Sequence, residues 1–149
     1  MTTTTAPAAN ARVIALAHYA GRALLEGVLA RHGVTFHQSV TLRALVAAGE
    51  SAGRDRLVAD VTGSLKTDES VTHGVIEEMT AAKLLEEDPA EASQVRLTDA
   101  GRELFDTTSA ESAEIAARLY GGIPAEDLAI AGRVLSLVTE RANAALAGA

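Results

Sequence analysis

The sequence contains no cysteine and no tryptophan, and aromatic residues make up only 3% of it. The absence of cysteine excludes disulfide bonds, thiolate catalysis, zinc–thiolate sites and cysteine-based peroxide sensing. The scarcity of aromatic residues in an alanine-rich chain favours closely packed helices over a β-sandwich. A chain of 149 residues is long enough for one well-packed domain, and nothing along it suggests a second.

Long apolar runs and positive charge are also scarce. No apolar run of membrane-spanning length is evident, and the threonine-rich start lacks the basic and apolar regions of a secretory signal. We therefore expect a cytoplasmic protein that does not contact a membrane. The net charge is −7, which is the wrong sign for a protein that attracts DNA phosphates through its overall field. Local charge must then decide whether nucleic acid is a partner.

Motifs for catalysis and for bound cofactors are absent as well. The sequence shows no glycine-rich phosphate loop, no nucleophile elbow and no metal-ligand spacing, so we expect no metal and no cofactor. Its four histidines are scattered. His18 and His37 carry side chains suited to acid–base chemistry and are the candidates if the chain is an enzyme. A function other than catalysis is the preferred interpretation.

Hydrophobic periodicity predicts a mainly α-helical chain with one small β-hairpin. Helices are expected over residues 10–32, 54–65, 68–82 and 98–120, a last helix after the break at Pro124, and a loop over residues 49–53. The turn-forming residues 88–91 predict a hairpin whose second strand covers residues 94–97. Helix, hairpin and helix in this order are typical of a winged helix-turn-helix, which we place at about residues 54–97.

The helix over residues 68–82 is the expected recognition helix. Its apolar residues recur at spacings of three to five and predict one stripe facing a core, made of Val71, Val75, Ile76 and Met79 and continued by Leu84. The opposite face is the one that a DNA groove would meet, and it carries Ser70, His73, Gly74, Glu77 and Glu78.

Two motifs around this helix resemble the MarR family of bacterial transcription regulators. Residues 97–101 (Leu-Thr-Asp-Ala-Gly) match the family's Leu-Thr-x-x-Gly helix start, and Leu84 and Leu85 match its Gly-Leu-Val turn, with Lys83 in place of the glycine. Residues 34–48 resemble the family's second helix. The resemblance covers residues 10–147.

The resemblance implies a winged helix-turn-helix domain over residues 10–149 that forms a homodimer. Residues 10–32 and 98–147 would be the dimerisation helices. The broad apolar stripe of the first helix and the regular seam of the last one are consistent with burial against a second chain. Residues 1–9 are small and polar, which is typical of a disordered arm.

Duplex DNA is the partner that the resemblance implies, but the expected contact surface is acidic. Residues 68–91 carry eight acidic side chains and one basic one, Lys83. Gly74 stands where the family usually has an arginine, Glu78 stands at a following basic position, and the hairpin lacks the family's Asp-x-Arg motif. Because phosphate contacts need cations, the candidate DNA-binding residues are Arg54, Arg56, Lys66 and Arg96, with Ser70, Thr72 and His73 as hydrogen-bonding residues.

A small aromatic or anionic ligand is the second partner that the resemblance implies, bound between the dimerisation helices and the winged domain. The candidate ligand-binding residues are His18, Tyr19, Arg22, Phe36 and His37. His18 and Arg22 lie four residues apart on one helix and could clamp a carboxylate or phenolate. The alternative for each is structural: a core histidine bonded to a backbone carbonyl, and an arginine paired with Glu26 or Glu114.

Two functions therefore remain open. The first is a ligand-responsive transcriptional regulator, a homodimer that reads a pseudo-palindrome and is released when a small molecule changes the spacing of its recognition helices. The second is a MarR-like scaffold that has lost DNA binding and uses its cleft as a small-molecule binding site or a catalytic site. The acidic segment 68–91 is the reason to consider the second.

Overall fold

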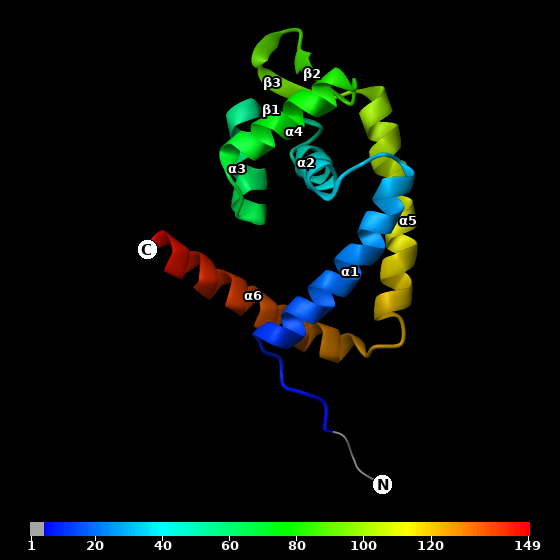
Figure 1. Cartoon of the computed structure of the whole chain (residues 1–149), viewed down its shortest axis with the longest axis vertical. Coiled ribbons are helices and arrows are strands. Elements are labelled where there is room, and N and C mark those ends of the chain that lie inside the picture. The colour runs from blue at the N-terminus through cyan, green and yellow to red at the C-terminus, as the bar shows by residue number, and fades with distance from the viewer. Residues whose placement is uncertain (1–4) are drawn as a thin grey trace. The chain divides into compact units, whose positions relative to one another are not determined.

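A computed structural model of the chain describes residues 5–149 (Figure 1). Within that range six helices and three strands follow one another as α1 (Ala11–Arg31), α2 (Phe36–Ala47), β1 (Ser51–Gly53), α3 (Arg54–Leu65), α4 (Glu69–Ala81), β2 (Leu85–Asp88), β3 (Glu91–Leu97), α5 (Asp99–Tyr120) and α6 (Ala125–Ala147). The predicted fold class, mainly helical with a small β-hairpin wing, is confirmed.

The differences from the sequence prediction lie in the strands and at the N-terminus. The predicted loop 49–53 contains strand β1, which is three residues long and too short to show an alternating pattern. Strand β3 begins at Glu91, earlier than expected. Part of the predicted arm, residues 1–4, lies outside the described residues, and residues 5–9 form neither helix nor strand and are exposed.

The three strands form one antiparallel sheet in the order β1-β3-β2. Strand β3 lies in the middle, with Ser51 of β1 opposite Arg96 on one side and Glu86 of β2 opposite Arg96 on the other. A register shift between Glu87 and Asp88 marks the start of the hairpin tip. Leu85, Val95 and Leu97 are buried and attach the sheet to the helices.

The core lies between the sheet and helices α2, α3 and α4, which Figure 1 shows gathered beside the strands. Its fully buried side chains include Leu42, Leu45, Leu57, Val61, Ile76 and Met79. Burial of a side chain of this size stabilises the fold by about 1.5–3 kcal/mol each. Helix α2 begins with a capping box, in which Thr35 and Gln38 each bond the other's backbone.

The apolar stripe of α4 is placed differently from the prediction. Val71 was expected to face the core, but its side chain is 48% exposed. Thr72 takes the core position instead and is fully buried. Its hydroxyl lies 3.1 Å from Nε2 of His37 in α2 and 3.2 Å from the hydroxyl of Thr62 in α3. A buried threonine is tolerated here because both neighbouring helices supply hydrogen-bond partners.

Helix α5 starts where the wing returns to the core. The Thr98 side chain caps the helix by accepting a hydrogen bond from the Gly101 backbone N–H, and its own hydroxyl lies within donating distance of the Leu84 carbonyl oxygen. A Cβ on Gly101 would lie only 2.2 Å from that same carbonyl oxygen and 2.8 Å from Cδ1 of Leu97. The glycine of the Leu-Thr-x-x-Gly motif is therefore required by a close backbone approach.

The C-terminal end of α1 is attached to α5 by charged side chains. Arg31 donates a hydrogen bond of 2.8 Å to one carboxylate oxygen of Glu111, and Nε2 of His32 lies 3.1 Å from the other. The two contacts fix α1 against the part of α5 that precedes Ile115.

Residues 116–149 form a second compact unit, made of the end of α5 and helix α6. Helix α6 is 23 residues long and contains no buried residue. Six of its large apolar side chains are between 41% and 59% exposed, and they are Ile130, Val134, Leu135, Leu137, Val138 and Leu146. An apolar surface of this extent is rare on the outside of a monomeric protein.

Helix α1 corrects the expectation that the chain has no apolar run of membrane-spanning length. It is long and apolar enough to cross a membrane by length and composition, with a mean hydropathy of 1.3. Arg22 and Glu26 interrupt its apolar surface and pair with each other at 3.2 Å. Core helices of soluble proteins pass the same test, so α1 does not by itself assign the chain to a membrane.

The close approach at Gly101 yields a stability prediction. We expect Gly101→Ala to lower the free energy of unfolding by about 1–3 kcal/mol, because the added methyl group forces α5 and the Leu84 backbone apart. Gly74→Ala is the matched control, since nothing lies within 4 Å of a Cβ at that position. In a helix interior that change should raise stability by roughly 0.5–1 kcal/mol. Urea unfolding at one fixed protein concentration measures both, and equal effects would contradict the prediction.

Candidate functional site

Helices α3 and α4 form the helix-turn-helix, and the β2–β3 hairpin that follows is the wing. Helix α3 ends at Leu65 with Lys66 in the left-handed conformation, and α4 begins after Asp68, whose carboxylate accepts a hydrogen bond of 2.8 Å from the Ser70 N–H. The buried residues of α4 leave its other face exposed or half-buried, and that face carries Ser70, Val71, His73, Gly74, Glu77 and Glu78.

Arg54 is the predicted DNA contact at the first position of α3, and it is tied to the recognition helix. Its Nη2 lies 3.7 Å from Oε1 of Glu77, and its Nε donates a hydrogen bond of 3.4 Å to Nδ1 of His73. His73 and Glu77 lie four residues apart, on one face of α4. The three side chains form a cluster that bridges α3 and α4.

The other predicted cations also have partners. Arg96 donates a hydrogen bond of 2.7 Å to Glu86, which lies opposite it in the hairpin. Arg56 lies 3.9 Å from Asp60 on the same helix, and the Lys66 amino group donates to the Gly63 carbonyl oxygen. Three of the four predicted DNA-binding cations are thus paired with carboxylates, which reduces the positive potential available to phosphates.

The structure corrects one predicted DNA contact. Thr72 is fully buried and its hydroxyl faces His37 and Thr62, so it lies on the core side of α4 and is excluded from contact with DNA. Ser70 is exposed in the first turn of α4 and His73 is half-buried beside Arg54. These two remain predicted contacts.

Four of the candidate ligand-binding residues form two groups, Arg22 with Phe36 and His18 with Tyr19. The Arg22 guanidinium of α1 lies over the Phe36 ring of α2, 4.1 Å from its centroid, which is the geometry of a cation–π contact. Arg22 also pairs with Glu26, which is one of the structural alternatives considered from the sequence. His18 and Tyr19 occupy exposed positions of α1, and their rings lie edge to face with centroids 5.9 Å apart.

His37 belongs to neither group, because its ring is hydrogen-bonded to Thr72 of α4. Burial lowers its pKa below the ordinary value of 6.5, because desolvation disfavours the imidazolium. The ring is therefore mostly neutral near pH 7 and connects α2 to the buried hydroxyl of α4. A structural role accounts for these contacts.

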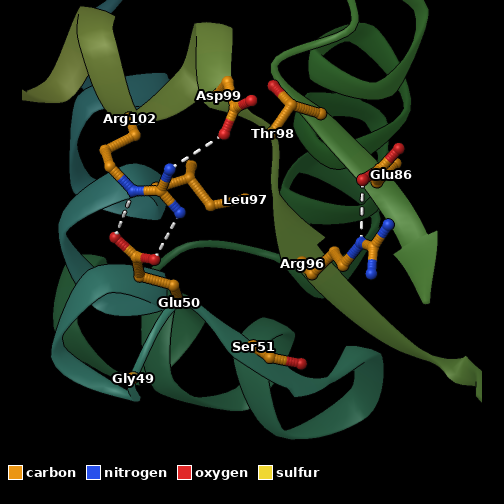
Figure 2. A pocket seen from close by; sticks show the side chains of 9 residues that line it. All are labelled: Gly49, Glu50, Ser51, Glu86, Arg96, Leu97, Thr98, Asp99 and Arg102. Carbon is orange, nitrogen blue, oxygen red and sulfur yellow. Dashed lines mark hydrogen bonds and ion pairs between the residues drawn. The ribbon is translucent and has the colours of Figure 1, made fainter.

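A groove of about 390 Å³ beside the sheet contains a cluster that the sequence did not reveal (Figure 2). Arg102 of α5 holds both carboxylate oxygens of Glu50 at 2.6 and 2.8 Å, and its Nη1 donates to Asp99 at 3.0 Å. Glu50 has a φ of +71° and lies just before β1. The only signal available was the position of Arg102 directly after the Gly101 of the helix-start motif.

The charged side chains of this groove are paired with one another. Figure 2 shows Arg102 directed at Glu50 and Asp99, and Arg96 directed at Glu86. The Arg102 hydrogen bond lowers the pKa of Glu50, and the same bond together with that to Asp99 raises the pKa of Arg102. Three carboxylates and two guanidinium groups leave no excess of positive charge. The hydrogen bonds between Arg102 and Glu50 fix the loop before β1 to α5.

Comparison with known proteins identifies the fold. No family model matches the sequence, and no curated protein matches it. A transcriptional regulator of the MarR family from Rhodococcus sp. RHA1 is similar in structure, with a TM-score of 0.68 and 18% identity over 85% of this chain and 89% of that one. The reduced form of MarR from E. coli has a TM-score of 0.68 and 16% identity, over 93% and 98% of the two chains.

A third structure is more similar in sequence. BpsR from Bordetella bronchiseptica, whose DNA binding is regulated by 6-hydroxynicotinic acid, has a TM-score of 0.66 and 28% identity over 85% of this chain and 96% of that one. The chain spans nearly the whole length of all three proteins. Its fold is the winged helix-turn-helix of the MarR regulators, as the sequence motifs predicted.

The Glu50–Arg102 pair yields a prediction about pH dependence. Because the folded-state pKa of Glu50 is lowered, the pair stabilises the protein above the ordinary glutamate pKa of 4.5 and is lost as the pH falls through the lowered value. We expect Arg102→Met, which keeps the aliphatic stem, to lower the melting temperature at pH 7 and to differ less from wild type in acid. Arg56→Met, which breaks an exposed pair within one helix, is the control. A constant difference across the acid range would contradict the prediction.

Proposed function

We propose that this chain, whose fold is that of the MarR regulators, is a cytoplasmic transcriptional regulator that binds duplex DNA as a homodimer and responds to a small aromatic or anionic ligand. The main support is the arrangement of α3, α4 and the β2–β3 wing, which leaves one face of a helix and a hairpin tip exposed on the same domain. This geometry suits a helix in the major groove and a wing beside it.

Helix α6 supports the dimer. It has apolar side chains along its length and no buried residue. Such a helix is stabilised when another surface covers its apolar side chains. A second copy of the chain is the partner we propose, with α1 contributing Leu16, Tyr19 and Leu24, which are between 47% and 65% exposed.

The DNA contacts we propose come from three places. Arg54 and Arg56 lie at the start of α3, Lys66 and Ser70 flank the start of α4, and Arg96 lies in the wing. His73 adds a ring nitrogen beside Arg54. Phosphate oxygens would replace carboxylates as partners of these arginines, an exchange between similar ligands that costs little where the pair is exposed.

The ligand would be recognised by Arg22 and the aromatic rings near it, Phe36 and Tyr19. BpsR is regulated by 6-hydroxynicotinic acid, an aromatic carboxylic acid. In this chain the Arg22–Glu26 pair is exposed and within one helix, so a ligand carboxylate can take the place of Glu26. His18 and His37 complete the predicted set.

A second function is favoured by the pairing of the predicted DNA-binding cations. Arg54, Arg56 and Arg96 each have a carboxylate within 4 Å, and the recognition face carries further acidic residues. A MarR-fold protein that has lost DNA binding would show such a surface and would act as a small-molecule binding protein or an enzyme, with His18 and His37 as the candidate acid–base residues.

DNA binding is measured directly with a labelled fragment of the protein's own upstream region. We expect saturable binding. The logarithm of the association constant should fall with the logarithm of the salt concentration, with a slope of about 0.9 for each phosphate contact. The triple variant Arg54→Ala, Arg56→Ala and Lys66→Ala should lose at least tenfold in affinity at ~50 mM salt and should show a shallower salt dependence. The control is Arg12→Ala, Arg118→Ala and Arg133→Ala, which has the same net charge. Absence of binding to this fragment and to random duplex at ~50 mM salt would favour the second function.

The oligomeric state is measured by size exclusion with light scattering. We expect a dimer, and we expect Leu135→Glu with Val138→Glu to give a folded monomer at concentrations where the wild type is dimeric, because two carboxylates would have to be buried in the contact. Val71→Glu on α4 is the control, since it places the same charge on an exposed apolar position of the winged domain. A dimer in all three proteins would exclude α6 as the interface.

A further inference from the structure

Arg54, its carboxylate partner Glu77 and the carboxylate partner of Arg96 border one groove. A groove of about 410 Å³ between α4 and the wing is lined by Arg54, Glu77, Glu86, Glu87, Val95, Thr80 and Ala81. It therefore contains the whole Arg54–Glu77 pair and the partner of Arg96. Glu77 and Glu86 lie on opposite sides of it, one from the recognition helix and one from the wing.

In the Arg54–Glu77 pair the arginine is fixed by a neighbouring side chain, whereas the glutamate is mostly exposed. The Arg54 side chain is 33% exposed and is fixed by its hydrogen bond to His73, whereas the Glu77 side chain is 74% exposed and lies 3.7 Å away. An exposed pair at this distance contributes little to stability, because solvent screens it. Glu77 can therefore leave Arg54 without cost to the fold.

The Arg96–Glu86 pair lies across two strands, and its carboxylate can likewise leave the arginine at little cost to the fold. Arg96 and Glu86 are directly opposite in the hairpin and 2.7 Å apart, with side chains 41% and 46% exposed. Cross-strand pairs of opposite charge at such exposure contribute little to stability. A phosphate that approaches Arg96 meets the Glu86 carboxylate at the same point.

We propose that Glu77 and Glu86 attenuate the DNA affinity of this protein by competing with phosphates for Arg54 and Arg96. The inference rests on the proposed DNA-binding function. Nonspecific binding consists almost entirely of phosphate contacts, whereas specific binding also gains from base contacts. Two carboxylates on the contact surface weaken both by a similar factor, because both use the same arginines for phosphate contacts. Because nonspecific binding starts from the lower affinity, the same factor brings it below the working protein concentration first.

The test uses the isosteric variants Glu77→Gln and Glu86→Gln in the full chain. Each should bind random duplex about 3- to 10-fold more tightly at ~50 mM salt, with a salt dependence steeper by about 0.9, because each exposes one more cation to phosphate. The gain for the upstream fragment should be of similar size, because the specific complex uses the same arginines for its phosphate contacts. Circular dichroism should show unchanged folding.

Two controls separate pairing from overall charge. Glu69→Gln removes one charge from the exposed first turn of α4, where no contact with an arginine is made in the described structure, and should change the affinity for random duplex by less than twofold. In Arg54→Ala, the further change Glu77→Gln should have no effect, since the carboxylate acts through that arginine. A Glu69→Gln gain as large as that of Glu77→Gln, or a Glu77→Gln gain that persists in Arg54→Ala, would overturn the inference.

The outcomes also distinguish the inference from the function on which it rests. Wild-type binding that is unchanged in both glutamine variants overturns the inference and leaves the regulator in place. A wild type that binds no DNA, together with a double variant that does, supports the inference and overturns the regulator. Absence of binding in the wild type and in the double variant overturns both.

Discussion

The close contact between Gly101 and the Leu84 backbone is the constraint on which the arrangement of the functional elements depends. Leu84 follows the end of the recognition helix α4, and Gly101 lies in the first turn of α5, with the whole wing between them in sequence. The Thr98 side chain bonds to both segments. A change in the position of α5 is therefore transmitted to the start of the wing and to the end of α4 without passing through flexible side chains.

Two further links tie this junction to the rest of the domain. Arg102, one residue after Gly101, holds Glu50 before β1, and β1 pairs with β3 of the wing. At the other end, Glu111 of α5 receives Arg31 and His32 from α1. The helix that we propose to bind ligand and the helix that we propose to read DNA are thus connected through α5 by charged contacts and one close backbone approach. This is a route by which ligand binding on α1 can bias the recognition helix.

The sequence predicted the features that depend on local patterns and missed those that depend on partners distant in the chain. Helical periodicity and the residue 97–101 motif were sufficient for the fold. Strand β1 was missed because three residues carry no period, and its pairing partner Arg96 lies far along the chain. The Glu50–Arg102 pair joins residues 52 positions apart. Within α4, hydrophobicity favoured Val71 over Thr72 as a core residue, because the polar partners of Thr72 lie on α2 and α3.

The fold and the charge of the recognition surface are encoded by different residues. Ile76 and Met79 are fully buried and fix α4 in the domain, whereas Glu77 is among the exposed residues between them and can change without affecting packing. A winged helix can thus keep its structure while its potential changes sign, and likeness of fold carries no information about that sign. Arginines lie at the start of α3 and in the wing, each with a carboxylate within 4 Å. The arrangement of α3, α4 and the wing is why we place DNA binding, attenuated by carboxylates, ahead of its complete loss.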